Sequence, residues 1–379
     1  MRFSEVIGHS LLKSRLLTAV SEGRVSHAQL FLGPEGSGAL PMALAYAQYL
    51  LCRQPVAGDA CGTCSSCMKA AKMVHPDITF SFPVPTKEKI SDPRSIDFIA
   101  EFRESVLANP YLNYHDWITA LELENKQGLI RIHEARYIIE RLSLKSVEGA
   151  FRIVLMWYPE KMNVEAANCL LKILEEPEEK TVFLLVAEND ETIPVTILSR
   201  TQLVKVTRLK DEEVLKGLSA IPGADSKLLQ PVTHRAAGNF RMALNLLAEE
   251  DPDADLAETF LAWMRACLKL NVQQLQKLGD ELAAIGRERQ KGFFEYCLSV
   301  VRECLLMNYG DEKLVRIEGK EKDSFRKLAP FIHSDNADGF IRALDEMHYH
   351  VERNANFKIQ FMDLSFRLNR LLNKKEGVS

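Results

Sequence analysis

The sequence predicts an α/β fold with a P-loop-type parallel sheet and helices on both faces, followed by domains made entirely of helices. The first observation is a strand, a glycine-rich turn and a helix in direct succession, at 28–32, 33–40 and 42–51. The second is that apolar strand-like runs alternate with amphipathic helical patterns as far as Arg208, beyond which only helical patterns follow. Such alternation is typical of a parallel sheet that is covered on both faces.

The glycine-rich turn has the spacing of a phosphate-binding loop. Gly33 and Gly38 are separated by four residues, and Gly36 lies between them, so we interpret the three glycines as a vestigial phosphate loop. A functional loop continues with Lys, which reaches the β- and γ-phosphates, and with Ser or Thr, which holds Mg²⁺. Ala39 and Leu40 stand at these two positions and do neither. The alternative is an ordinary glycine turn between a strand and a helix.

The composition is that of an ordinary globular protein. The 379 residues are 46% hydrophobic and 26% charged, and the net charge of −4 gives no general attraction to nucleic acid or membranes. No apolar run reaches membrane-spanning length, and no secretion signal follows Met1. We therefore expect a cytoplasmic protein without a membrane partner, in which clustered cysteines favour a metal over disulfides.

Four cysteines follow the first predicted helix with the spacing of a zinc site. Cys52, Cys61, Cys64 and Cys67 form a C-x8-C-x2-C-x2-C pattern, and four thiolates bind Zn²⁺ tetrahedrally in structural sites. We predict one structural zinc in an insert at 52–67, the alternative being free or transiently oxidised thiols. His75 is expected to be a loop residue. The remaining cysteines lie in helical patterns and are expected to pack in the core: Cys169, Cys267, Cys297 and Cys304.

The pattern loosens between about 76 and 128, where aromatic residues are spread among charges of both signs. A helix is predicted within 96–108. A surface that stacks nucleic-acid bases is one interpretation of the aromatics. An extra insertion packed on the sheet is the favoured one, because acidic residues are as frequent as basic ones here.

Regular structure then resumes, with predicted helices at 130–144 and 164–176 and predicted strands at 151–157, 181–187 and 203–206. In P-loop ATPases an acid at the end of a neighbouring strand holds Mg²⁺. Here Trp157 is followed by Tyr158 and Pro159, and Glu160 is expected to be a surface or helix-capping acid. A second part of the ATPase machinery is therefore missing.

The rest of the chain is predicted to be helical. We divide the chain into an α/β domain at 1–207, a small helical domain at 208–250 and a longer helical domain at 251–379. The boundary between the two helical domains is the acidic segment 249–253, which contains a proline.

Several motifs occur in a familiar order. They are His27-Ala28, the glycine loop, the four cysteines, His75-Pro76-Asp77, the segment 168–177 (Asn-Cys-Leu-Leu-Lys-Ile-Leu-Glu-Glu-Pro) and the segment 197–200 (Ile-Leu-Ser-Arg). In this order they resemble the delta-prime subunits of bacterial DNA polymerase III clamp loaders, over about residues 1–250 and more loosely beyond. The related gamma/tau subunits keep the loop Lys and the strand-end acids.

This resemblance implies an AAA+ module, a helical lid domain and a collar domain that assembles the ring. It also implies a non-catalytic member of a five-subunit loader, which opens the sliding clamp and places it on primer-template DNA. The implied partners are the gamma/tau ATPase subunits and the delta subunit, with clamp and DNA contacted through the assembled complex. The zinc would be the cofactor, and no ATP would be hydrolysed by this chain.

The resemblance also carries residue roles. The four clustered cysteines match the zinc ligands of the family, and Arg200 matches an arginine that reaches into the ATP site of a neighbouring subunit, with Thr201 in place of the usual Cys. The alternative for Arg200 is a structural ion pair with Glu188 or Asp190. Arg241 matches a lid-domain arginine that senses nucleotide in active relatives, the alternative being a helix-surface or salt-bridge arginine.

Two other functions compete with the non-catalytic subunit. The first is an active AAA+ ATPase of the gamma/tau type, in which Lys161 or Lys172 replaces the loop Lys, although neither lies on the loop. The second is a zinc-dependent DNA-binding module. The acidic balance and the lack of a basic stripe near the cysteines count against the DNA-binding module.

Overall fold

A computed structural model describes residues 1–86, 92–122, 127–144, 146–148, 151–248, 254–310, 314–317, 319–353 and 355–374. The chain forms two compact units, Met1–Leu244 and Asn245–Ser379, and each is described by itself. The predicted division into three domains stays a prediction, and the acidic segment 249–253 lies outside the described residues.

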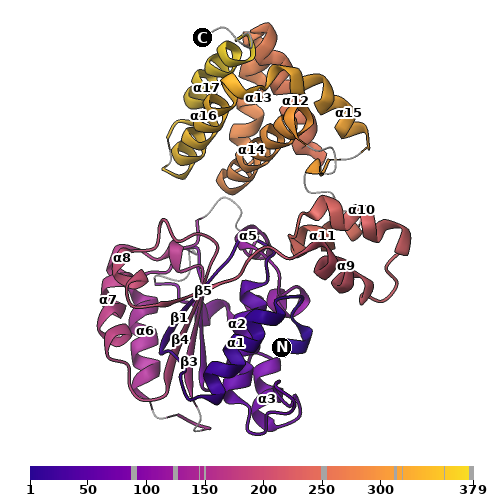
Figure 1. The fold of residues 1–379 in the computed structure, drawn as a ribbon. Coiled ribbons are helices and arrows are strands. Elements are labelled where there is room, and N and C mark those ends of the chain that lie inside the picture. Colours follow the sequence, from indigo (N-terminus) through magenta and orange to yellow (C-terminus); the bar gives the residue numbers. More distant parts are fainter. Residues whose placement is uncertain are drawn as a thin grey trace. The chain divides into compact units, whose positions relative to one another are not determined.

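The first unit is built on one sheet, in which the described strands are parallel and follow the order β2-β3-β4-β1-β5 (Figure 1). The strands are β1 (Ala28–Leu32), β2 (Ile78–Ser81), β3 (Arg152–Trp157), β4 (Thr181–Ala187) and β5 (Gln202–Lys205). β4 is buried along its whole length, as expected for a strand covered on both faces. Neighbouring residues of β1 point to opposite faces, so Leu30 and Phe31 belong to different core clusters.

Helices cover both faces of this sheet, with α1, α2 and α3 on one side and α6 and α7 on the other (Figure 1). The first side begins with a 3-10 helix, Phe3–Glu5, and its α-helices are α1 (Ser10–Ser21), α2 (Ala39–Leu51) and α3 (Ser65–Ala71). The second side comprises α6 (Ile132–Ser143), α7 (Val164–Glu175) and the short α8 (Val195–Leu198), and a 3-10 helix, Pro159–Lys161, follows β3. After β5 every described element is a helix, which confirms the predicted fold class of a parallel sheet with helices on both faces, followed by helical regions.

Sequence pattern explains where two of these helices begin and end. α2 begins at Ala39, before the predicted position 42, because Gly38 takes a left-handed φ of 94° that turns the chain directly into the helix. α7 begins after Asn163, whose side chain accepts a hydrogen bond from the Ala166 amide, and it ends before Pro177.

The segment predicted as an insertion packs on the sheet, as expected, but contains more regular structure than the sequence suggested. β2 and α5 (Tyr114–Ala120) were not predicted, while the predicted helix at 96–108 is a 3-10 helix, Ser95–Phe98, followed by α4 (Ile99–Ala108). The aromatic residues of this segment form a buried cluster. Phe102 stacks on Phe82 with ring centroids 3.9 Å apart, and its edge contacts Trp117 at 5.4 Å. These aromatics are therefore core residues and are not available to stack bases.

Three helices follow the last strand in the first unit: α9 (Asp211–Ser219), α10 (Ser226–Ala236) and α11 (Phe240–Leu247). α10 and α11 are joined by Ala237 and Gly238, which both have a positive φ. Phe240 packs against Gly217 of α9, where a Cβ atom would lie 2.7 Å from its ring. This close packing brings the start of α11 against the rest of the helical group.

The second unit is helical throughout its described residues. Its elements are α12 (Ala254–Lys269), α13 (Val272–Ala284), α14 (Arg287–Tyr309), α15 (Gly319–Leu328), a 3-10 helix (Ala329–Phe331), α16 (Ser334–Glu352) and α17 (Phe357–Leu372). Trp263 is fully buried, stacks on Phe361 at 4.9 Å and donates a hydrogen bond to Ser365. As predicted, three of the remaining cysteines are buried in this core, and the fourth is half-buried on α7 and packs against the core of the first unit: Cys267, Cys297, Cys304 and Cys169.

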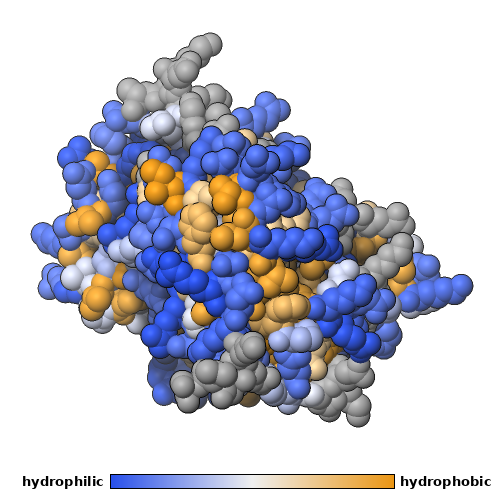
Figure 2. Space-filling model, turned by 90° about the horizontal axis from the view of Figure 1, so that it is seen from above, coloured by the Kyte–Doolittle hydropathy of each residue, from blue (hydrophilic) through white to orange (hydrophobic). Residues whose placement is uncertain are grey.

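The surface is largely hydrophilic on the face that Figure 2 shows, with hydrophobic residues in small groups between the polar ones. Within the described part of the chain, we find no helix with the length and apolar character needed to cross a membrane.

Candidate functional site

The glycine loop follows the path of a phosphate-binding loop, from β1 into the first turn of α2. The Gly33 amide donates a hydrogen bond to the Ala187 carbonyl at the end of β4, at 3.1 Å. Ala39 and Leu40, at the positions of the missing Lys and hydroxyl, are 9% and 4% exposed and belong to the apolar core. The loop therefore connects a strand to a helix, as a phosphate-binding loop does, and the two residues at the positions of Lys and the hydroxyl are packed in the core.

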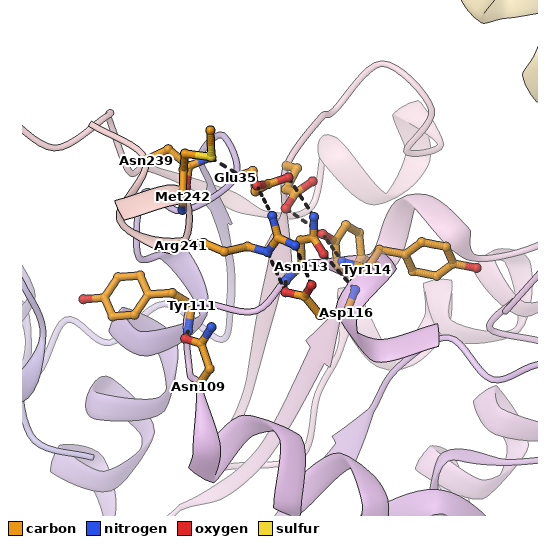
Figure 3. A network of polar contacts seen from close by, with 11 residues as sticks. Glu35, Asn109, Tyr111, Asn113, Tyr114, Asp116, Asn239, Arg241 and Met242 are labelled. Carbon is orange, nitrogen blue, oxygen red and sulfur yellow. Dashed lines mark hydrogen bonds and ion pairs between the residues drawn. The ribbon is translucent and has the colours of Figure 1, made fainter. Parts of the chain in front are cut away.

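The loop carries an acid that other segments hold in place. The Glu35 carboxylate accepts hydrogen bonds from Asn113 at 2.9 Å, from Asn239 at 3.1 Å and from Arg241 at 3.1 Å (Figure 3). Asn239 also approaches the backbone so closely that a Cβ atom at Gly36, whose φ is 66°, would lie 1.8 Å from its side-chain oxygen. The insertion and the start of α11 thus meet on the loop.

Arg241 is the centre of this polar network. Its side chain is 12% exposed, and Nε and Nη2 each lie 2.5 Å from a carboxylate oxygen of Asp116, in a two-pronged ion pair (Figure 3). Burial acts to lower the pKa of Arg241, but Asp116 and Glu35 raise it on balance, so the guanidinium stays charged. Arg241 therefore forms salt bridges within its own chain, and the choice between the two alternatives for its role stays a prediction.

Tyr111 of the insertion covers another side of the loop. Its ring lies 4.8 Å from the Phe240 ring, and its hydroxyl accepts a hydrogen bond from the Ile7 amide at 2.9 Å. A Cβ atom at Gly38 would meet this ring at 3.2 Å. Pro110, Tyr111 and Leu112 line the cavity beside the loop together with residues from the ends of β3 and β4. The insertion therefore supplies one wall of the space where a nucleotide would have to enter.

Glu160 lies in the first turn of the 3-10 helix after β3, where the sequence predicted a surface or helix-capping acid. It is half-buried, and Oε1 accepts a hydrogen bond from the backbone amide of Glu188 at 2.9 Å. Burial raises the pKa of Glu160 to about 7. Tyr158, with a φ of 56°, turns the chain between the end of β3 and Glu160, and its hydroxyl donates a hydrogen bond to Glu188 at 2.6 Å. Two carboxylates thus lie beyond the ends of β3 and β4.

The lysines considered as replacements for the loop Lys lie on other elements. Lys161 packs over the ring of Tyr114, with Nζ 4.8 Å from the ring centroid, and Lys172 is exposed on α7. Neither is part of the loop.

Arg200 lies between α8 and β5, at the edge of the sheet, and its side chain is 29% exposed. Nε donates to Glu175 Oε1 at 2.8 Å, Nη2 contacts the same oxygen, and Nη1 donates to the Thr196 carbonyl at 2.8 Å. The expected alternative partners, Glu188 and Asp190, are wrong, because the carboxylate that reaches Arg200 comes from the C-terminal end of α7. The guanidinium is thus held within its own chain, near the surface.

The four clustered cysteines come together as predicted. Their sulfur atoms lie within 4.8 Å of one another, and Cys61 Sγ is 3.9 Å from Cys67 Sγ. Sulfurs at tetrahedral corners around zinc, with bonds of about 2.3 Å, are about 3.8 Å apart, so the cluster fits this ion. All four thiols are free of disulfides.

Backbone amides donate hydrogen bonds to three of the cysteine sulfurs. The Cys61 amide donates to Cys52 Sγ at 3.2 Å, and the Cys64 amide donates to Cys61 Sγ at 3.3 Å. The Cys67 amide donates to Cys64 Sγ at 3.4 Å. The hydrogen bond from the Cys64 amide is the main cause that lowers the pKa of Cys61 to about 6, whereas burial raises the pKa of Cys67. His75 lies apart from the sulfurs in a buried hydrogen bond with Ser66, consistent with a structural role.

Comparison with known proteins agrees with the resemblance found in the sequence. A family model described as "DNA polymerase III, delta subunit" matches residues 8–210. The DNA polymerase III subunit delta' of Pseudomonas aeruginosa is 32% identical over 180 residues, which are 47% of this chain and 43% of that protein. The DNA polymerase III subunit tau of Escherichia coli is 25% identical over 306 residues, which are 76% of this chain and 41% of that protein.

The chain thus spans less than half the length of these two relatives. A solved structure of a DNA polymerase III gamma subunit-related protein from Thermotoga maritima aligns over 96% of this chain and all of that chain, with 15% identity and a TM-score of 0.36. Because the family model covers more than half of its residues, the chain belongs to the DNA polymerase III delta subunit family.

Proposed function

We propose that the chain is a non-catalytic, delta-prime-type subunit of the DNA polymerase III clamp loader. In this role it acts in the cytoplasm with gamma/tau ATPase subunits and a delta subunit to load the sliding clamp on primer-template DNA. The observation that carries the proposal is the glycine loop, which keeps its backbone path while Ala39 and Leu40 are buried in place of Lys and a hydroxyl residue. The assignment to the DNA polymerase III complex rests on the relatives, which are named as subunits of DNA polymerase III.

The charges around the loop also argue against ATP hydrolysis. A nucleoside triphosphate carries several negative charges, which functional loops neutralise with Lys and Mg²⁺. Here Glu35 on the loop and Glu188 beside it are acidic, and Arg241 is already engaged by two carboxylates. Like charges at short distance in a partly desolvated site repel strongly, so binding of a triphosphate is disfavoured.

Steady-state hydrolysis by the purified chain tests this part of the proposal. We expect no turnover above background. Turnover at a rate typical of AAA+ enzymes, retained in Arg200→Ala and lost in Lys161→Ala or Lys172→Ala, would establish the gamma/tau-type ATPase instead.

We further propose that Arg200 is lent to the ATP site of a neighbouring subunit. A guanidinium is always charged and offers a planar fork of donors, which suits the charge that spreads over the γ-phosphoryl oxygens during transfer. An arginine supplied in this way typically contributes about 10³–10⁵ in rate. Arg200 suits this role because it lies near the surface at a sheet edge and its partner Glu175 is itself 46% exposed.

Substitution in the assembled loader separates this role from a structural one. Arg200→Ala should leave the subunit folded and the complex assembled, yet reduce DNA- and clamp-stimulated hydrolysis at the adjacent site. Arg200→Lys should restore little, because a point charge does not copy the fork. Arg15→Ala, which removes an exposed arginine of α1, is the matched control and should have no effect. Wild-type hydrolysis and clamp loading by Arg200→Ala loaders would show that Arg200 is only structural.

Finally, we propose that Cys52, Cys61, Cys64 and Cys67 hold one structural Zn²⁺. A shell of four thiolates leaves no open position for water, so the ion would stabilise the insert at 52–67 and take no part in chemistry.

A further inference from the structure

The segment between β2 and α6 places one carboxylate, Asp116, against the loop. Asp116 lies in the first turn of α5, where its Oδ2 accepts from the Asn113 amide at 3.1 Å and the Asn113 side chain accepts from the Asp116 amide at 2.9 Å. α5 is itself anchored, because buried Trp117 donates a hydrogen bond from its indole N–H to the Pro83 carbonyl at 2.8 Å. The position of the carboxylate is therefore fixed by its own segment and does not depend on Arg241.

The Asp116 carboxylate contacts Arg241 in the way that a phosphate group would. A guanidinium forms the same two-pronged contact with a carboxylate as with a phosphate group. Arg241 Nε and Nη2 each donate a hydrogen bond to an oxygen of Asp116 at 2.5 Å. Nη1 is used on Glu35 of the loop at 3.1 Å. The arginine next to the loop is thus occupied by two carboxylates from its own chain (Figure 3).

The same contacts hold α11 on the loop. The Phe240 amide donates to the Gly36 carbonyl at 3.0 Å, and the Asn239 side chain donates to Glu35 at 3.1 Å. A buried arginine without a partner would be a costly charge, so the ion pairs with Asp116 and Glu35 stabilise this arrangement.

We propose that Asp116 and Glu35 together act as an internal anionic ligand, which occupies Arg241, fixes α11 on the loop without nucleotide and excludes phosphate from the loop. The chemical class that this ligand replaces is a di- or triphosphate anion. The exclusion lies within one chain and does not depend on the role proposed for Arg200.

Gain of anion binding tests the proposal. Glu35→Gln combined with Asp116→Asn keeps the size of both side chains and one acceptor oxygen in each but removes both charges, which leaves Arg241 and the amides at the start of α2 facing the loop. Titration calorimetry with inorganic pyrophosphate at low salt should show binding at least about tenfold tighter than for the wild-type chain, because two repulsive charges are removed and one cation is released. Adding Arg241→Ala should abolish the gain.

Asp97→Asn is the matched control. Asp97 has the same capping role at the 3-10 helix of the same segment, with the Arg94 amide 2.9 Å from Oδ2, and its substitution should leave pyrophosphate binding unchanged. No gain in the folded Glu35→Gln/Asp116→Asn chain, or a gain that persists without Arg241, would overturn the proposal.

Hydrogen exchange gives a second, independent measurement on the same chain. In Asp116→Asn, amides at the start of α11 should exchange at least about tenfold faster than in the wild type, because the helix has lost its strongest attachment to the loop. The reversed pair Asp116→Arg/Arg241→Asp should recover part of the protection. Unchanged exchange in Asp116→Asn would show that the ion pair does not fix α11.

Discussion

Replacing Phe102 by alanine should loosen the whole segment that covers the loop. Phe102 is 1% exposed and lies at the centre of the aromatic cluster, stacked on Phe82 at 3.9 Å and in edge contact with Trp117 at 5.4 Å. Its ring is also 5.5 Å from Trp157 at the end of β3, so it joins the insertion to the sheet. Phe→Ala substitutions in cores cost about 3–5 kcal/mol, and aromatic pairs of this kind contribute about 0.5–1.5 kcal/mol each beyond burial. We therefore expect a loss of about 4–5 kcal/mol in the free energy of unfolding.

Urea unfolding measures this loss. Trp117 and Trp157 belong to the cluster and report on the first unit by fluorescence, provided that Trp263→Phe removes the signal of the second unit. Leu107→Ala is the matched control on the same helix, because Leu107 is 53% exposed and its substitution should change stability by less than about 0.5 kcal/mol. If Phe102→Ala cost no more than Leu107→Ala, the aromatic cluster would not be what attaches the insertion to the sheet.

Three further predictions concern the metal, a buried acid and the arginine at the sheet edge. Elemental analysis of protein purified without chelator should find one zinc per chain, and Cys64→Ser should lower this occupancy and leave the helical signal of the second unit unchanged. Because burial raises the pKa of Glu160 from 4.5 to about 7, the folded chain binds the extra proton between these values, and stability falls as pH rises through this window. Glu160→Gln should remove this pH dependence. Measured by urea unfolding, the free energy of unfolding of the variant should rise relative to that of the wild type by about 2 kcal/mol between about pH 5 and pH 8. The same dependence of this free energy on pH in both proteins would refute the prediction. Glu175→Gln should raise stimulated ATP hydrolysis in the loader by up to about fivefold, because an exposed ion pair worth up to about 1 kcal/mol no longer holds Arg200. Glu176→Gln is the control and should have no effect. A lower rate in Glu175→Gln would contradict the proposal that Arg200 must leave Glu175 to act on a neighbouring subunit.

The parts of the fold that the sequence predicted are those with a strong local signal. β3 and β4 are continuous apolar runs, and α7 has a complete apolar face between Asn163 and Pro177, so each was found within a residue or so of its bounds. β2 and α5 were missed because they are short, at 4 and 7 residues, and their regularity depends on partners elsewhere. β2 is an edge strand that pairs only with β3 among the described strands.

The polar network at the loop was beyond sequence patterns for a related reason. Arg241 is 125 positions from Asp116 and 206 from Glu35, and no local spacing links opposite charges at such separations. The half-burial of Glu160 was not predicted, because this residue follows a left-handed turn at Tyr158, and a non-glycine residue with positive φ is not predictable from its type. The cysteine cluster was predictable because all four cysteines lie within one short stretch, and their spacing is that of a metal site.

In the proposed non-catalytic role, the obstacles to nucleotide binding are spread over three segments and are not confined to the loop. Restoring Lys at Ala39 alone would place an ammonium in a position that is 9% exposed, without removing the carboxylates of Glu35 and Asp116 that hold Arg241. Removing those carboxylates alone would free a cation but supply neither the Lys nor the hydroxyl that holds Mg²⁺. Each change is costly without the others, so core packing at Ala39 and the ion pairs of Arg241 together stabilise this arrangement. If the proposed internal ligand is correct, α11 would stay on the loop whatever nucleotide a neighbouring subunit bound.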